Sequence, residues 1–407
     1  MLGRDASGAR CTVPLSEDLL SRHLLFLGGI GTGKTNAIFQ LLSHLREGMT
    51  SQDVMLVFDT KGDYYREFYR PGDVVISNDS KATGPDGVDH WNIFGEIGAG
   101  ESVEANIVEI AKTLFHERTE KTSQPFFPNA AKDLFCGILT HFARAGGREP
   151  MDNARLRSFL DEATAADLRS MLQSHADMKA MVSYIADDRS PQTQGVLSEL
   201  QQMVREILIG NFRKAGTLSV RDAIRRKGGH CIFVEYDLGI GNLLTPIYRL
   251  LLDLAVKESL CREKSEGNVW FVIDEFRLLP NLQHMDSGVN FGRSLGAKFI
   301  VGAQSIEQIF HGYGESLARS ILSGFMTTAA FRVNDATTRE FIKGLFGKNR
   351  KREAYMASVQ TRGIVENVRD ANVVEDWDVT NLATGQAILG LPGHMPFVFQ
   401  MDRYKEV

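Results

Sequence analysis

A glycine-rich segment constrains the fold of this chain more than any other feature. Residues 28–35 read Gly-Gly-Ile-Gly-Thr-Gly-Lys-Thr, which matches the pattern G-x-x-x-x-G-K-S/T. The apolar run 24–27 precedes this segment, and a stretch with helix-forming composition, 36–42, follows it. Strand, loop and helix in this order direct backbone amides and a helix N-terminus at a phosphate group. A chance glycine-rich turn would need neither flanking element, so the sequence predicts a phosphate-binding loop in an α/β domain.

The phosphate-binding loop also predicts its ligands. The residues expected to bind the nucleotide are Gly28, Gly29, Ile30, Gly31, Thr32, Gly33, Lys34 and Thr35. Lys34 is expected to contact the β- and γ-phosphates, and the Thr35 hydroxyl is expected to ligate magnesium. The expected cofactors are therefore ATP and Mg2+.

Two acids follow a second apolar run. Residues 269–273 read Val-Trp-Phe-Val-Ile, and Asp274 and Glu275 come directly after them. Phosphoryl transfer to water needs a carboxylate near the magnesium ion and a group that orients the water. We assign these roles to Asp274 and Glu275, respectively. Hydrolysis, as distinct from nucleotide binding, rests largely on Glu275.

Two further polar residues are candidates for catalysis. Gln304 follows the apolar run 299–303 and could reach the γ-phosphate as a sensor, or it could simply begin the next helix in solvent. Arg293 could be an ordinary cation at a helix end. It could also be an arginine finger that reaches the γ-phosphate in a neighbouring subunit, which would make hydrolysis depend on assembly.

Short apolar runs alternate with longer helical stretches along much of the chain. This alternation predicts a mostly parallel central sheet with crossover helices. Several runs are apolar throughout, as expected for central strands covered on both faces. The predicted strands are 23–27, 54–58, 74–77, 231–236, 269–273, 299–303, 327–333, 387–391 and 397–401.

The alternation stops between residue 98 and about residue 220. Apolar residues there recur at helical spacing, and Asp152 and Thr164 are placed to cap two of the helices. The predicted helices are 101–115, 129–145, 153–160, 165–175 and 193–209. We therefore expect a discontinuous nucleotide-binding domain, 1–97 and 221–407, with an all-helical insertion at 98–220. The fold class is α/β, a RecA-like P-loop NTPase domain with a mostly parallel sheet.

The charge balance gives no global reason to expect nucleic acid. The chain has 407 residues, 46 Lys+Arg and 51 Asp+Glu, and its net charge is −5. The basic run 348–352, and Arg221 together with the run 225–227, could contact a phosphate backbone or line a pore. A solvated helix end is the more common explanation for either run, and the second is followed by two glycines, as at a helix C-terminus.

The sequence contains no membrane-spanning or secretory pattern. No apolar run reaches the ~18–20 residues needed to cross a bilayer, and the first residues lack the basic-then-apolar order of a signal peptide. The four cysteines include no close pair. These observations predict a soluble, cytoplasmic protein without a transmembrane segment, or the soluble part of a protein that is anchored by other means.

Further motifs identify a family. They are Phe58-Asp59-Thr60-Lys61-Gly62-Asp63, Trp91-Asn92-Ile93-Phe94, Ala303-Gln304-Ser305 and Phe331-Arg332-Val333-Asn334-Asp335-Ala336-Thr337-Thr338. Together with the phosphate-binding loop and the acid pair, they make nearly the whole chain resemble type IV secretion coupling proteins of the TraD and TrwB kind. That family lies within the FtsK–HerA superfamily of hexameric pumping ATPases. Thr60 and Ile93 stand where the family has prolines.

The resemblance implies a function and partners. It gives Lys34, Thr35, Asp274, Glu275, Gln304 and Arg293 the roles described above. It also implies a homo-hexamer whose all-helical domain faces the cytoplasm, with DNA, single- or double-stranded, or relaxase or effector proteins as cargo. Secretion-channel components at the inner face of the cell membrane would be further partners. The family's usual N-terminal transmembrane helices are absent from this sequence.

Three other functions remain open from the sequence. A nucleotide-gated adaptor would recruit cargo through the helical insertion and do little mechanical work. A cytosolic DNA translocase of the HerA kind would share the chemistry but not the membrane partner. A small-molecule kinase would share the phosphate-binding loop, but such kinases lack the acid pair and the late glutamine.

Overall fold

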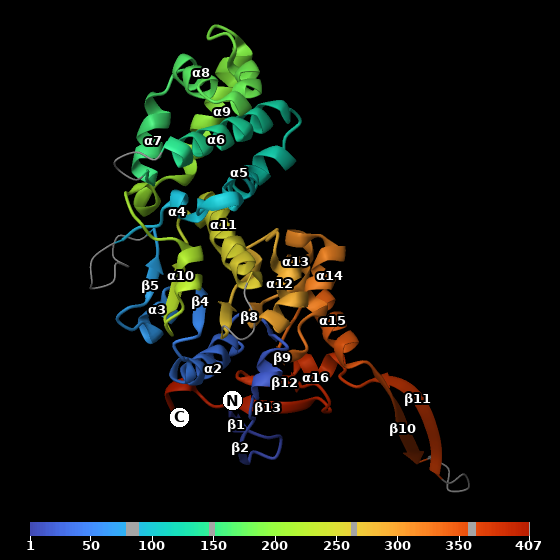
Figure 1. The fold of residues 1–407 in the computed structure, drawn as a ribbon. Helices are drawn as coiled ribbons and strands as arrows, with labels where there is room; N and C mark the ends of the chain where they lie inside the picture. Colours follow the sequence, from blue (N-terminus) through green and yellow to red (C-terminus); the bar gives the residue numbers. More distant parts are fainter. Residues whose placement is uncertain (79–88, 146–150, 262–266, 357–363, 407) are drawn as a thin grey trace. The chain divides into compact units, whose positions relative to one another are not determined.

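The computed structural model describes the chain except for residues 79–88, 146–150, 262–266, 357–363 and 407. The chain forms two compact units (Figure 1). Unit 1 comprises Met1–Met49, Trp270–Pro280 and Val289–Val407, and unit 2 comprises Thr50–Val269 and Asn281–Gly288. The predicted helical insertion, 98–220, falls within unit 2 together with three strands.

Unit 1 is built on a mixed sheet with the strand order β2-β1-β13-β12-β9-β3-β8-β7. The strands are β1 (Leu2–Arg4), β2 (Arg10–Thr12), β3 (Leu24–Leu27), β7 (Val269–Ile273), β8 (Ala297–Ala303), β9 (Thr327–Phe331), β12 (Gln386–Gly390) and β13 (Phe397–Met401). Strand β3 pairs in parallel with β8 and β9, so that Leu27 is opposite both Ala303 and Ala330. The strands beyond β9 pair antiparallel.

The parallel strands of unit 1 are buried over their whole length. Every residue of β3, β7, β8 and β9 is buried. Both faces of these strands are therefore covered, which is why their sequences are continuously apolar rather than alternating. The helices of unit 1 are α1 (Glu17–Leu20), α2 (Lys34–Gly48), α13 (Ile306–Tyr313), α14 (Glu315–Ser323), α15 (Ala336–Phe346) and α16 (Asp376–Thr380). Helix α12 (Met285–Phe291) lies where the chain passes from unit 2 back to unit 1.

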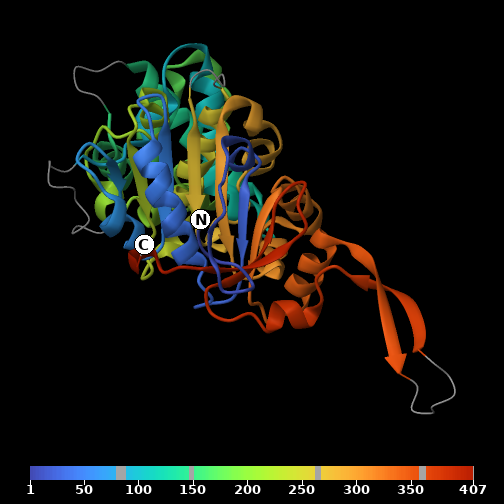
Figure 2. The same ribbon diagram turned by 90° about the horizontal axis from the view of Figure 1, so that it is seen from below.

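A two-stranded antiparallel hairpin, β10 (Lys348–Met356) and β11 (Ile364–Asn372), was not predicted. Figure 2 shows it extending away from the other strands of unit 1. The basic run 348–352 lies on β10, so the interpretation of this run as a helix end is wrong. Its cations are exposed and face acids in part: Arg350 lies 3.8 Å from Asp370 on the paired strand. Residues 348–353 of β10 are all polar, so this part of the strand lacks the apolar alternation by which strands are recognised.

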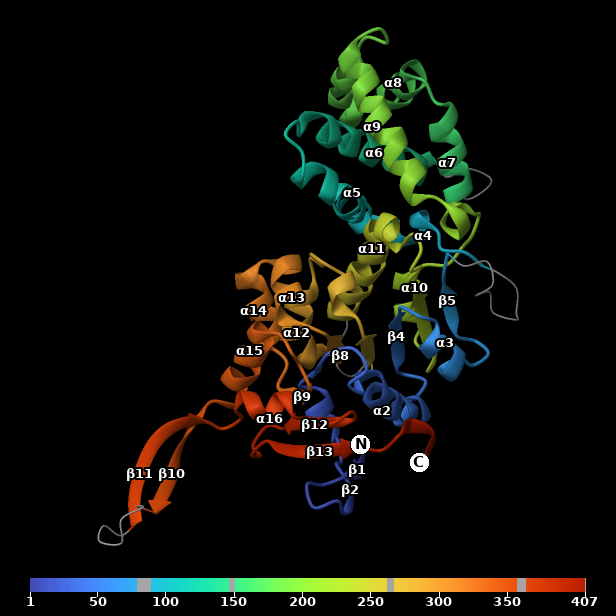
Figure 3. The ribbon, with the colours of Figure 1, turned by 180° about the vertical axis from the view of Figure 1, so that it is seen from behind.

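Unit 2 contains three parallel strands in the order β4-β6-β5, and most of the described helices (Figure 3). The strands are β4 (Val54–Asp59), β5 (Val74–Ile76) and β6 (Cys231–Glu235). The helices are α3 (Asp63–Phe68), α4 (Ile93–Ile97), α5 (Val103–Glu120), α6 (Phe126–Ala145), α7 (Asn153–Glu162), α8 (Ala165–Gln173), α9 (Pro191–Ile207), α10 (Val220–Arg226) and α11 (Gly241–Leu260). Helices α5–α9 correspond to the five that were predicted.

The predicted helix caps are present. Asp152 accepts a hydrogen bond from the Arg155 amide at the start of α7, and Thr164 accepts one from the Asp167 amide at the start of α8. Both bonds satisfy amides that the first helical turn leaves without partners. Local sequence therefore sets where these helices begin.

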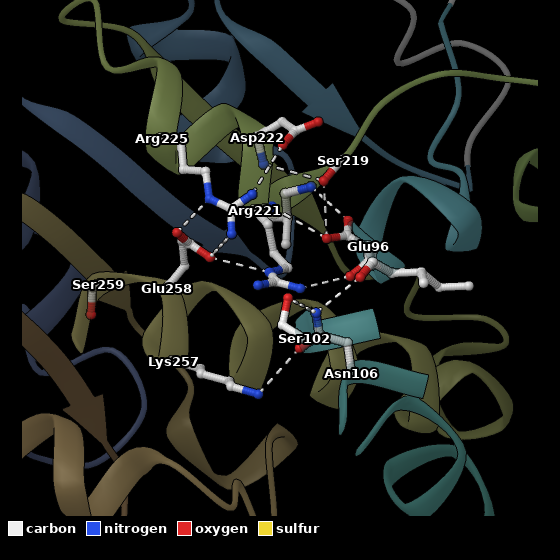
Figure 4. Close-up of polar contacts among 12 residues, drawn as sticks. Glu96, Ser102, Asn106, Ser219, Arg221, Asp222, Arg225, Lys257, Glu258 and Ser259 are labelled. Atoms are coloured by element: carbon white, nitrogen blue, oxygen red, sulfur yellow. Dashed lines mark hydrogen bonds and ion pairs between the residues drawn. The ribbon is translucent and has the colours of Figure 1, made fainter. Parts of the chain in front are cut away.

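A buried polar cluster joins the two places where the chain enters and leaves the helical segment (Figure 4). Glu96, on α4, is completely buried. Its carboxylate accepts hydrogen bonds from Trp91 Nε1 at 2.9 Å, Ser219 Oγ at 3.1 Å and the Val220 amide at 2.6 Å. Because Ser219 and Val220 begin α10, this carboxylate caps a helix that lies 123 residues further along the chain.

The same cluster extends to α11 through two arginines. Arg221 donates to the backbone oxygen of Glu96 at 2.8 Å and to Glu258 at 3.1 Å. Arg225 donates to Glu258 at 2.6 Å. The side chains of Arg221 and Glu258 are nearly inaccessible, so this is a buried ion pair with further hydrogen bonds. Arg221, which the sequence suggested only as part of a basic patch, is therefore structural.

Candidate nucleotide-binding and hydrolysis site

The phosphate-binding loop connects β3 to α2 in unit 1. Its backbone is tied to both neighbouring strands, because Gly28 N donates to Ala303 O at 3.1 Å and Gly29 N donates to Arg332 O at 2.9 Å. Gly33 has a φ of 112°, in the region that favours glycine, and it directly precedes the helix. A Cβ atom at Gly28 would lie 2.6 Å from the Phe331 side chain. The glycines therefore serve a turn and a close approach that other residues would obstruct.

Lys34 lies over the loop rather than in solvent. Its ammonium group donates hydrogen bonds to Gly28 O at 2.5 Å and to Gly29 O at 3.0 Å, and the residue is 7% exposed. Thr32 Oγ1 also donates to Gly29 O, at 2.8 Å. The loop therefore places a positive charge among its own backbone groups, beside the N-terminus of α2, where an anion is favoured.

The start of α2 meets the end of β7. Thr35 Oγ1 donates a hydrogen bond to Asp274 Oδ2 at 2.7 Å. A Cβ atom at Gly302 on β8 would overlap the backbone oxygen of Asp274, so this end of the sheet is closely packed. A hydroxyl and a carboxylate side by side are oxygen ligands of the kind that magnesium prefers. Because magnesium usually binds through one or two such groups and phosphate oxygens, these two residues fit it.

The second acid and the glutamine also lie together. Gln304 Nε2 donates to Glu275 Oε2 at 2.5 Å, and Arg277 Nε donates to Glu275 Oε1 at 2.9 Å. The Glu275 side chain is 16% exposed, whereas that of Arg277 is 45% exposed. Arg277 was missed by the sequence reasoning. A cation two residues after the acid pair was the available signal, and it is not specific.

Arg293 is held elsewhere in unit 1. It lies in a short 3-10 helix, Gly292–Leu295, and its NH2 group contacts Asp18 Oδ1 at 2.9 Å. Its side chain is 47% exposed. Among the described residues, the structure thus brings together Lys34, Thr35 and Asp274 around the loop and Glu275 with Gln304, but it joins Arg293 to none of these residues.

The C-terminal segment is attached to the helix that begins at the loop. Asn36 Nδ2 and Gln40 Nε2 both donate to the backbone oxygen of Asp402, at 2.9 and 2.5 Å. The Tyr404 amide donates to Asn36 Oδ1 at 2.9 Å, and the Tyr404 ring packs edge-on against Phe39. Helix α2 therefore has a fixed support immediately after Thr35. Two amide side chains in a helix gave no local indication of this arrangement.

The motif at the end of β4 lies in unit 2. Asp59 accepts hydrogen bonds from the backbone amides of Lys61 at 3.1 Å and Tyr65 at 2.9 Å. Burial raises the pKa of Asp59 above its usual value, while these amide bonds act in the opposite direction. Gly62 has a φ of 69°, so it supplies the left-handed turn before α3. The Asp-x-Lys-Gly motif thus builds a capped turn in this unit.

Two features are absent from the residues that the structure describes. No group of three or more His, Cys, Asp or Glu side chains is arranged to hold a metal ion. A magnesium ion would therefore depend on substrate oxygens as well as on Thr35 and Asp274. No described helix is both long enough and apolar enough to pass through a lipid bilayer.

Comparison with known families places the chain among secretion proteins. The family model for the type IV secretion-system coupling protein DNA-binding domain matches residues 9–401. The coupling protein TraD of Escherichia coli K12 is 23% identical over 421 residues, which covers 99% of this chain and 55% of TraD. The chain therefore spans about half the length of that relative.

Comparison with solved structures concerns the fold. An unbound crystal form of the conjugative coupling protein TrwBdeltaN70 has a TM-score of 0.77 and 21% identity, covering 96% of this chain and 87% of that chain. TrwB in complex with the ATP analogue ADPNP, and TrwB with ADP and Mg2+, each have a TM-score of 0.74 and 22% identity over 96% of this chain and 87–88% of that chain. The predicted α/β P-loop NTPase fold, with its mostly parallel sheet, is confirmed.

Proposed function

The chain belongs to the family of type IV secretion-system coupling proteins, and we propose that it is an ATP-hydrolysing motor that couples cargo to a conjugation or secretion channel. The observation that carries this proposal is the convergence of Thr35 with Asp274 and of Glu275 with Gln304 in one unit. The TrwB complexes with ADPNP and with ADP and Mg2+ support ATP and magnesium as the cofactors.

ATP binds with its phosphates in the loop 28–35. Backbone amides and the N-terminus of α2 hold the phosphate oxygens, and Lys34 pairs with the β- and γ-phosphates. Magnesium, held by Thr35 with Asp274 beside it, supplies positive charge to the phosphates when bound. The short Thr35–Asp274 distance supports their use by a single ion.

Hydrolysis proceeds from a water molecule that Glu275 orients. The water oxygen forms a bond to the γ-phosphorus while the bond between that phosphorus and the β–γ bridging oxygen breaks. The Glu275 carboxylate accepts a hydrogen bond from the water and takes up its proton. ADP carries away the electron pair of the broken bond. Gln304, which touches Glu275, senses the γ-phosphate through its amide group.

The active form is a homo-hexamer in which Arg293 acts on a neighbour. Its exposed side chain and its pairing with Asp18, away from the loop, support a role outside its own site. The helical insertion 98–220 is a separate functional domain on the nucleotide-binding domain 1–97 and 221–407. The partners of the protein are DNA, or relaxase or effector proteins, together with channel components at the inner face of the cell membrane. The family description, a DNA-binding domain, supports the first of these.

The decisive experiment measures ATP turnover against protein concentration, with and without single-stranded DNA. The proposed motor shows turnover that rises more than proportionally with concentration and increases with DNA. Lys34→Ala abolishes turnover, whereas Glu275→Gln retains nucleotide binding and stalls hydrolysis. Flat, DNA-independent turnover would favour a nucleotide-gated adaptor instead. Near-normal turnover of Glu275→Gln would remove the assigned role of that residue.

A further inference from the structure

The carboxylate of Glu275 is held at both of its oxygens. Gln304 Nε2 donates to Oε2 at 2.5 Å, and Arg277 Nε donates to Oε1 at 2.9 Å. The two donors come from different elements, since Gln304 follows β8 and Arg277 lies in the 3-10 helix Phe276–Leu278. A carboxylate that is bound at one oxygen can still rotate about its side-chain bonds, whereas one bound at both oxygens has a defined plane and direction.

The backbone that carries Arg277 is itself firmly supported. Phe276, the preceding residue, is buried and stacks on Tyr313 with ring centroids 5.2 Å apart. Tyr313 Oη donates to Leu279 O at 2.5 Å, on the other side of Arg277. Leu279 is also buried. The guanidinium therefore reaches Glu275 from a fixed base, although the side chain itself is 45% exposed.

We propose that Arg277 is a positioning residue for hydrolysis, one that holds the Glu275 carboxylate in the orientation from which it accepts a proton from water. This inference rests on the proposed function of Glu275. Charge-assisted hydrogen bonds fix geometry more strongly than neutral ones, and Gln304 alone would supply only a neutral donor. Because the γ-phosphate competes for the amide of Gln304, Arg277 is the donor that continues to hold Glu275 when ATP is bound.

A purely structural role for the Arg277–Glu275 pair would instead lower the melting temperature when Arg277 is replaced. An exposed ion pair contributes little to folding stability, so replacing Arg277 leaves the melting temperature nearly unchanged. Loss of orientation at a reacting group instead lowers the rate of the chemical step, on the order of tenfold or more. Binding of ATP, which depends on the loop 28–35, is unaffected. The effect is therefore on kcat and not on KM.

The test uses the full chain with Arg277→Ala, Arg277→Lys and Glu275→Gln. We expect Arg277→Ala to lower kcat about tenfold, with an unchanged KM for ATP and unchanged affinity for fluorescent ADP. Arg277→Lys retains a cation and recovers most of the rate. Arg277→Ala added to Glu275→Gln causes no further loss in single-turnover hydrolysis, because both changes act on one carboxylate. Arg319→Ala is the matched control, as Arg319 is an exposed arginine of the same unit paired with Glu315 on α14.

The possible failures are distinguishable. Unchanged kcat in Arg277→Ala, together with stalled Glu275→Gln, would overturn the role of Arg277 alone. A loss of nucleotide affinity in Arg277→Ala would mean that Arg277 acts on the nucleotide and not on Glu275. The same conclusion would follow if adding Arg277→Ala to Glu275→Gln lowered the hydrolysis rate by the same factor as Arg277→Ala alone. Either result would overturn the inference. Near-normal turnover of Glu275→Gln would remove the proposed role of Glu275 and that of Arg277 with it.

Discussion

The hydroxyl of Thr35 lies 2.7 Å from the carboxylate of Asp274, although 239 residues separate them in the sequence. One residue begins the helix after the phosphate-binding loop and the other ends a strand of the same sheet. In α/β sheets, ligands bind beyond the carboxyl ends of the parallel strands, because loops from several strands meet there. This contact therefore places the loop and the first acid at one site.

Asp274→Asn is expected to weaken the affinity of the hydrolysis site for magnesium. The amide keeps the shape of the side chain but removes its charge, so about tenfold or more magnesium is needed for half-maximal turnover. Affinity for ADP in the absence of metal is unchanged. Turnover titrated with Mg2+ measures the effect, and Glu315→Gln, at an exposed carboxylate of α14, is the control. An unaltered magnesium titration would argue against Asp274 as a ligand.

Gly302→Ala is expected to impair the site without changing any polar residue. Its Cβ atom would overlap the backbone oxygen of Asp274, and that oxygen belongs to the main chain, which cannot rotate away. The variant should lose at least about 1–3 kcal/mol of stability and most of its turnover. Gly344→Ala, on α15, is a matched control, because a Cβ atom there meets nothing within 4 Å.

The control variant Gly344→Ala is itself expected to change the free energy of unfolding. Alanine in a helix interior is more favourable than glycine, so Gly344→Ala should gain about 0.4–1 kcal/mol. Urea unfolding and ATP turnover of both variants provide the comparison. If the two glycine replacements had equal effects, the close approach of β8 to Asp274 would not be important.

Glu96 predicts a pH dependence of stability. Burial raises the pKa of Glu96 from its ordinary value of 4.5 to about 7. The folded chain therefore binds this proton more tightly than the unfolded chain, and the resulting stability is present below pH 4.5 and is lost as the pH rises to about 7. The free energy of unfolding should fall by up to about 3 kcal/mol across this interval.

Glu96→Gln tests this dependence. The glutamine cannot titrate, so the difference between urea unfolding at pH 4.5 and pH 8 should shrink by the same amount. Neighbouring charges, Arg221 and its partner Glu258, remain in place and serve as the constant background. An identical pH dependence in the two proteins would contradict the prediction. Nucleotide binding by unit 1 should be unchanged.

If Arg293 acts on a neighbouring subunit, two inactive variants should restore each other's turnover when they are mixed. Arg293→Ala alone should reduce turnover by about a hundredfold or more, as expected for an arginine finger. Mixing this variant with Lys34→Ala should restore part of the turnover, because a mixed oligomer contains sites with an intact loop and an intact neighbour. Asp18→Ala, which removes the partner of Arg293, is the control and should keep turnover. A mixture as inactive as its components would exclude action in trans.

The sequence predicted most of the fold where local patterns were strong. The buried parallel strands and helices α5–α9 were all anticipated, because both leave a clear hydrophobic pattern. Strands β1, β2, β10 and β11 were not anticipated. Strands β1 and β2 are only three residues long, and β10 begins with the wholly polar run 348–353, so the periodic apolar pattern that identifies a strand is missing there.

The candidate site was predicted in its parts. The loop 28–35, Asp274 and Glu275 carry their own local motifs, since glycines and strand-ending acids are recognisable without knowledge of the fold. The role of Gln304 is ambiguous in the sequence, because only the position of β8 brings this side chain within hydrogen-bonding distance of Glu275. Arg277 had no distinguishing pattern, because an arginine after an acid is common on protein surfaces.

The sequence by itself determined the residues of the phosphate-binding loop, the acid pair, the buried strands and the helical segment, since each depends on neighbours a few positions away. Only the tertiary structure decided which side chains share a partner: Thr35 with Asp274, Arg277 with Gln304 across Glu275, and Glu96 with the start of α10. Three of these contacts, Thr35 with Asp274, Gln304 with Glu275, and Glu96 with Val220, join residues that are far apart in the sequence and close only in the folded chain. Their hydrogen bonds depend on three-dimensional position, which the spacing of residues along the chain does not reveal.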